Sequence, residues 1–244
     1  MADDRHVPRP GTTSAVLASL ISTLTPAASE PFESHGVQRR RRAIVVLVLV
    51  LGAALLGLSL TRVPGDPSFY WLTTAMAVVW GGGAVVSGPL RLGWVSVSGR
   101  RHRPILMGIG VGGVVAAVFI AGALVAREIE VIAEPIGRVL SYAHHGRLTV
   151  VVAITVVNGM AEELFFRGAL YSALGKARPL LFSTVLYAMT TSASGNPALG
   201  FAAVVLGAIC AVERRATGGI LAPVLTHLVW GLVMVLALPP LFGA

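Results

Sequence analysis

The residues of this sequence that could do chemistry are concentrated between positions 158 and 168, Asn-Gly-Met-Ala-Glu-Glu-Leu-Phe-Phe-Arg-Gly. Glu163 and Arg167 are four residues apart, so on a helix they share a face and can form an ion pair. Glu162 lies about 100° further round the helix, on the face of Asn158. We therefore expect Glu163 to have a structural role and Glu162 to be free to activate water as a general base.

The segment that carries these acids is otherwise as apolar as a membrane-spanning helix. An ionised carboxylate in hydrocarbon is costly unless it has a partner, a water-filled cavity or a function. Arg167 provides a partner for one acid, but no second cation lies at helical spacing upstream of Glu162. This pattern favours a functional site at Glu162.

The composition indicates the elements that must position these side chains. The chain has 244 residues, of which 55% are hydrophobic and 12% charged, and its mean hydropathy is +0.80. Soluble domains have about 25% charged residues. The sequence therefore predicts an all-α, polytopic membrane helix bundle of about seven transmembrane helices. The expected spans are residues 43–60, 68–87, 105–126, 148–166, 180–193, 198–212 and 219–238.

The distribution of basic residues predicts how the bundle is oriented. Nineteen Lys and Arg against eleven Asp and Glu give a net charge of +8, and the basic residues lie between the apolar runs. They are typical of cytoplasmic loops and of contacts with membrane lipid, and nucleic-acid binding is not expected. The run Arg39–Arg42 directly precedes the first span, so we expect a multi-pass protein of the plasma membrane with a cytoplasmic N-terminus and an outside C-terminus. Residues 1–38 are predicted to be a disordered cytoplasmic tail, residues 39–244 the transmembrane bundle, and residues 127–147 an outside loop or surface helix.

The sequence offers few ligands for a metal ion. Cys210 is the single cysteine, which excludes an intramolecular disulfide and a cysteine-based metal site. Catalytic zinc usually needs three protein ligands, and the acid Glu163 is expected to pair with Arg167. We therefore expect no metal and no cofactor.

The motif Glu162-Glu163-x-x-x-Arg167 at the end of an apolar helix resembles the signature of the CPBP family. This family comprises intramembrane endopeptidases related to type II CAAX prenyl proteases and to bacteriocin-immunity membrane proteins. Residues 215–227, Arg-Ala-Thr-Gly-Gly-Ile-Leu-Ala-Pro-Val-Leu-Thr-His, resemble its last motif, a turn followed by a helix that carries a histidine. The resemblance covers residues 148–238.

The resemblance implies a role for each matching residue. Glu162 would be the general base, Glu163 and Arg167 would complete the first motif, and His227 would polarise the scissile carbonyl. The family's second motif is Phe-x-x-x-His, and the matching residues 187–191 are Tyr-Ala-Met-Thr-Thr, so Thr191 stands in place of the histidine. Gly231 stands where the last motif has an amide.

The resemblance implies an intramembrane endopeptidase acting on a membrane-embedded or lipid-linked peptide. Asn158 and Thr191 are candidate binding residues that could supply hydrogen bonds in place of the missing groups. The loss at Thr191 leaves open an alternative, a catalytically silent homologue that acts as a membrane scaffold or immunity factor. A proton-coupled transporter is a third class, disfavoured because the acids cluster on one span. If Glu162, His227 and Thr191 converge on one cavity, with the Glu163–Arg167 pair behind it, the shape of the site is preserved. A His227 that faces lipid or lies far from Glu162 would exclude the catalytic interpretation.

Overall fold

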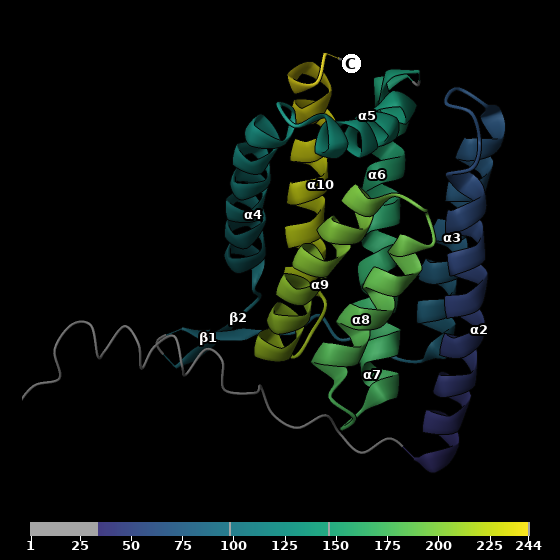
Figure 1. The fold of residues 1–244 in the computed structure, drawn as a ribbon. Helices are drawn as coiled ribbons and strands as arrows, with labels where there is room; N and C mark the ends of the chain where they lie inside the picture. The colour runs from purple at the N-terminus through teal and green to yellow at the C-terminus, as the bar shows by residue number, and fades with distance from the viewer. Residues whose placement is uncertain (1–33, 98, 146, 244) are drawn as a thin grey trace, which may run out of the picture.

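The computed structural model describes residues 34–97, 99–145 and 147–243, and these form an almost entirely helical bundle (Figure 1). Its helices are α2 (His35–Ser59), α3 (Pro67–Ser87), α4 (Ile105–Ala126), α5 (Glu130–His144), α6 (Leu148–Glu163), the π-helix η1 (Leu164–Leu170), α7 (Tyr171–Leu174), α8 (Pro179–Ser192), α9 (Pro197–Thr217) and α10 (Leu221–Leu241). In the described part of the chain, six helices are long and apolar enough to cross a membrane, with residues 148–174 counted as one. The protein is an all-α polytopic membrane bundle.

The expected fifth span corresponds to α8, which has 14 residues. A helix perpendicular to a bilayer needs about 20 residues to cross its hydrocarbon core, and α8 is therefore not among the six. The start of α2 and the C-terminus nevertheless lie at opposite ends of the bundle, as expected. In Figure 1 the start of α2, the hairpin and the connections α7–α8 and α9–α10 lie at one end of the bundle. Helix α5 and the C-terminus lie at the other, which we name the α5 end.

The fourth span is longer than the sequence analysis predicts. It was expected to end at Phe166, with the acids at its inner end, but it continues through η1 and α7 to Leu174. The expectation is wrong because Arg167 is fully buried and paired inside the protein, so it does not mark the edge of the membrane. Glu162 consequently lies near the middle of this 27-residue span.

Helix α2 begins at His35, so residues 35–38 of the predicted tail are helical, while residues 1–33 lie outside the described residues. The side chains of Gln38 and Arg42 both donate to the carbonyl of Ala173, over 3.1 Å in each case. The last carbonyls of a helix have no partner within it. These two bonds therefore attach the start of α2 to the end of α7.

Local sequence explains where several helices begin. Asp66 precedes Pro67, and its side chain accepts a hydrogen bond from the backbone N–H of Ser68. Asn196 precedes Pro197 in the same way and caps α9. A capping side chain followed by proline is a typical helix start, because the proline lacks the N–H that would have no partner there.

Two contacts hold the helices that carry the candidate site. Phe166 of η1 packs edge-on against Trp80 of α3, with ring centroids 5.5 Å apart. On the other side, α4 packs closely on α10 at Gly108 and Gly112. A Cβ atom at Gly112 would lie only 2.8 Å from the carbonyl oxygen of Thr226. These glycines are four residues apart, which is the small-residue spacing that lets membrane helices approach closely.

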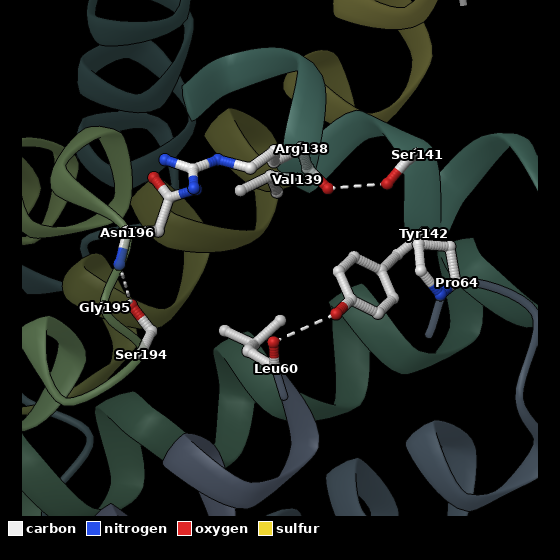
Figure 2. Close-up of a pocket in the computed structure, with 9 residues that line it drawn as sticks. All are labelled: Leu60, Pro64, Arg138, Val139, Ser141, Tyr142, Ser194, Gly195 and Asn196. Carbon is white, nitrogen blue, oxygen red and sulfur yellow. Dashed lines mark hydrogen bonds between the residues drawn. The ribbon is translucent and has the colours of Figure 1, made fainter. Parts of the chain in front are cut away.

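At the α5 end, helix α5 forms hydrogen bonds with two turns, the one that follows α2 and the one that precedes α9. The Tyr142 hydroxyl lies 2.6 Å from the Arg62 carbonyl and 3.1 Å from that of Leu60, and Asn196 donates to the Pro135 carbonyl over 2.8 Å. Figure 2 shows Tyr142 and Asn196 on opposite sides of a cavity of about 210 Å³. None of the predicted site residues lines this cavity.

At the opposite end, residues 91–94 bind the start of α10 through the backbone. Ile220 and Leu221 donate to the carbonyls of Arg91 and Leu92, and Trp94 donates to that of Thr217. We name residues 91–94 the strap. It leads into an antiparallel hairpin of β1 (Val95–Val97) and β2 (Arg100–His102), where only a basic loop was expected. Since the first N–H groups of a helix lack partners within it, the strap satisfies donors that α10 cannot.

Candidate active site

Glu163 is the centre of a buried group of polar side chains. Its Oε1 accepts a hydrogen bond from Arg167 Nη1 at 2.8 Å, so the predicted ion pair is present. The same oxygen lies 2.8 Å from His227 Nδ1. Glu163 and Arg167 are both completely inaccessible, and the structure brings together three of the predicted site residues from α6, η1 and α10.

The bond to Glu163 fixes the orientation of the His227 ring. A carboxylate only accepts hydrogen bonds, so we assign the hydrogen of the imidazole to Nδ1. Nε2 of the neutral ring is then an acceptor, and it lies 4.0 Å from Glu162 Oε2. A carboxylate that holds the far nitrogen of a catalytic histidine is the arrangement of hydrolytic triads.

Glu162 has a second neighbour that the sequence analysis did not identify. The Tyr187 hydroxyl donates to Glu162 Oε2 over 2.6 Å. Tyr187 is the first residue of the stretch that matches the family's second motif, and Thr191 is the last. A hydroxyl at a position where the motif has Phe is the signal that could have identified it.

Arg167 is fixed by α9 as well as by Glu163. Its Nη2 donates to the Gly207 carbonyl over 3.0 Å, and its own carbonyl accepts from Arg214 Nε over 2.8 Å. Within η1 the backbone has π-helical geometry, which usually occurs as short insertions near functional sites. The π-helix therefore places Arg167 where both its guanidinium and its carbonyl meet α9.

Two glycines lie where α6 and α10 meet, Gly159 on α6 and Gly231 on α10. A Cβ atom at Gly159 would lie 3.2 Å from His227 Cδ2, so the absence of a side chain there lets the imidazole lie against α6. A Cβ atom at Gly231 would lie 3.3 Å from the side chain of Thr155. The position where the family has an amide therefore also faces α6.

The two predicted binding residues, Asn158 and Thr191, differ in burial and in their hydrogen bonds. Asn158 is buried and donates to the Ile154 carbonyl over 3.0 Å, and its Oδ1 has no hydrogen-bond partner among the described residues. Thr191 is half-buried on α8. Within the part of the chain that the structure describes, it makes no hydrogen bond with Glu162, Glu163 or His227. The polar contacts of the site therefore join Glu162 to His227 and do not include Thr191.

The acids lie deep in the membrane-spanning part of the bundle. Glu162 follows the start of its span at Leu148 by 14 residues and precedes its end at Leu174 by 12. At about 1.5 Å per residue, it lies roughly 20 Å from either end. Its side chain is 17% exposed and that of His227 9%, so the site is accessible, though narrowly.

The residues present do not form a recognisable metal centre. Over the described ranges there is no group of three or more His, Cys, Asp or Glu side chains that could hold a metal ion. Glu163 Oε1 is already shared by Arg167 and His227. The donor set therefore fits hydrogen-bond chemistry better than metal coordination.

A comparison with known proteins gives a match over the segment that carries these groups. Residues 144–233 match the model of a family described as type II CAAX prenyl endopeptidase Rce1-like. The matched segment includes all the polar groups described above. No curated protein and no solved structure gives a match to the chain.

Proposed function

We propose that Glu162 activates water for peptide-bond hydrolysis within the membrane. The match of residues 144–233 to the type II CAAX prenyl endopeptidase Rce1-like family supports this proposal, because the segment contains Glu162 and His227. The observation that carries this proposal is the pair of acceptors Glu162 Oε2 and His227 Nε2, which face each other over 4.0 Å. A water about 2.8 Å from both would subtend roughly 90° between them. This is close to the angle between the two hydrogens of water, so one molecule could donate to both atoms.

The proposed reaction uses this water as the nucleophile. Glu162 takes one of its protons while the water oxygen attacks the carbonyl carbon of the scissile bond. The tetrahedral intermediate then collapses with cleavage of the C–N bond, and the proton held by Glu162 moves to the leaving nitrogen. Glu163 holds His227 in the tautomer that can accept the second hydrogen of the water, so in this proposal His227 binds the water and does not polarise the scissile carbonyl.

The surroundings support a membrane-embedded or lipid-linked substrate. The site lies among apolar helices, so a peptide must reach it within the hydrocarbon region. Asn158 Oδ1, buried and without a partner among the described residues, is one helical turn before Glu162. We propose that it accepts a hydrogen bond from the backbone of the bound peptide, since an unpaired buried carbonyl oxygen is costly.

The test is cleavage by the purified full-length protein in liposomes. Two probes are compared, a peptide ending in a prenylated cysteine motif and an unmodified transmembrane peptide. Glu162→Gln should lower kcat at least about 10²-fold, the usual contribution of a general base. Glu128→Gln is the matched control, because Glu128 is exposed and forms its ion pair with the neighbouring Arg127 at the protein surface.

Equal cleavage by wild type and Glu162→Gln would exclude Glu162 as the base. If wild type cleaves neither probe, the endopeptidase proposal fails. A scaffold would then be expected to keep its cellular effect in the Glu162→Gln variant. Preference for one probe would identify the substrate class.

A further inference from the structure

The Tyr187 hydroxyl is a buried polar group at the site that takes no part in the proposed reaction steps. It donates to Glu162 Oε2 over 2.6 Å, and the residue is only 4% exposed. It comes from α8, whereas the other groups at the site come from α6, η1 and α10. The same carboxylate oxygen faces His227.

We propose that Tyr187 is a positioning residue for Glu162 and compensates for the missing histidine of the second motif, in whose place Thr191 stands. The proposal rests on the function proposed above. A carboxylate oxygen has two lone pairs. Tyr187 occupies one lone pair of Oε2 and leaves the other for the water beside His227.

Three neighbours pack against the Tyr187 ring and keep its hydroxyl pointing toward Glu162. Arg167 lies over the ring, with its guanidinium carbon 4.5 Å from the centroid, and Phe166 packs edge-on at 4.8 Å. Gly207 of α9 lies against the ring edge, where a Cβ atom would come within 2.9 Å of Cδ1. The ring therefore cannot swing toward a bound substrate.

The hydroxyl acts through Glu162 because it has a single hydrogen. While that hydrogen is donated to the carboxylate, it cannot stabilise an oxyanion. A hydrogen bond to the charged form of an acid favours that form. Tyr187 therefore favours the ionised form of Glu162 and fixes the direction of its carboxylate, and a general base needs both properties before water binds.

Other groups also act on the charge of Glu162. Glu163 and Arg167 follow it on its own span, His227 faces it from α10, and Cys210 lies nearby on α9. A Tyr187→Phe variant leaves these groups unchanged and keeps the ring beneath Arg167. Its effect therefore reports on the hydroxyl alone.

The first experiment compares cleavage by three variants of the full-length protein. Tyr187→Phe should lower kcat about 10- to 100-fold with little change in KM. The double variant Tyr187→Phe/Thr191→His restores the family's Phe-x-x-x-His pattern and should recover at least tenfold. Tyr171→Phe, another buried tyrosine beneath an arginine, should cleave like wild type. Unchanged kcat in Tyr187→Phe, or a double variant no better than the single one, would overturn the proposal.

A second experiment does not depend on cleavage. A hydrophobic carbodiimide modifies carboxyl groups in their protonated form, and mass spectrometry can follow the modification of Glu162 as a function of pH. The midpoint for Glu162 should move to higher pH in Tyr187→Phe, because a hydrogen bond to an ionised group is lost. An unchanged midpoint would show that Tyr187 does not control Glu162. If the midpoint shifts in a protein that cleaves neither probe, Tyr187 does position Glu162. The proposed function would then fail independently of this inference.

Discussion

The hydroxyl of Thr226 has one hydrogen but lies within hydrogen-bond distance of two acceptors. Its Oγ1 is 3.0 Å from the Gly108 carbonyl and 2.9 Å from Glu213 Oε1. Both contacts are hydrogen bonds only if Glu213 is protonated, so that it donates to Thr226 while Thr226 donates to Gly108. The other oxygen of Glu213 is buried without a partner among the described residues, which also suits a neutral acid.

This reasoning predicts the effect of two nearly isosteric changes. Glu213→Gln places an N–H donor where the protonated acid has its O–H, so the bond to Thr226 is kept and the free energy of unfolding should change by less than about 1 kcal/mol. Thr226→Val removes a hydrogen bond to the Gly108 carbonyl and leaves the buried Glu213 acid without its partner, so it should cost about 1–3 kcal/mol. Unfolding in mixed detergent measures both. A Glu213→Gln variant as unstable as Thr226→Val would mean that Glu213 is ionised.

At the residue scale, the sequence predicted the Glu163–Arg167 pair because helical spacing alone determines it. The approach of His227 to the acids was implied only by the family resemblance. Tyr187 and Glu213 were missed because their partners lie 25 and 13 residues away on other helices. No local pattern carries that information.

At the scale of the elements, the position of His227 depends on how closely α4 approaches α10. Gly112 faces α10, where a Cβ atom would meet the Thr226 carbonyl, while a Cβ atom at Gly113 has nothing within 4 Å. The two neighbouring glycines therefore form a matched pair. Only one of them is needed for packing.

Gly112→Ala should destabilise the protein by about 1–3 kcal/mol, because the new methyl group must displace α10. It should also lower kcat, since a shift of about 1 Å in a catalytic group can cost 10²-fold. Gly113→Ala should be neutral or stabilise by up to about 1 kcal/mol, because alanine favours the helix. Thermal unfolding and cleavage assays check both. Equal effects of the two changes would contradict the packing role of Gly112.

The spans themselves were largely predictable, since long apolar runs interrupted by charges define membrane helices. The limits of α4 agree with the expected span, Ile105–Ala126. The error at Arg167 arose because a buried, paired arginine has the same sequence signature as an arginine at the membrane surface. The β1–β2 hairpin was not expected, since each strand has three residues.

At the scale of the whole molecule, the arrangement of the ends makes the predicted orientation testable. Arg62 and Lys176 are exposed and belong to opposite ends of the bundle. The single cysteine, Cys210, is fully buried and gives little background. In intact cells a membrane-impermeant maleimide should label Arg62→Cys and not Lys176→Cys, both in a Cys210→Ser background.

Lysed cells should label both variants. Labelling of Lys176→Cys alone in intact cells would mean that the N-terminus is outside, contrary to the positive-inside expectation. Neither result would alter the proposed chemistry, because Glu162 lies near the middle of its span.

The strap has a consequence for how the protein is made. Arg91 and Leu92 accept hydrogen bonds from the first N–H groups of α10, the helix that brings His227 to Glu162. Helix α10 is the last helix of the described chain to emerge during synthesis, and its docking position is prepared by residues synthesised much earlier. A nascent chain can therefore carry the two acids in the membrane without a complete active site. Hydrolytic competence would arise only when the final helix has been inserted and has docked, so incomplete chains would not cleave their neighbours.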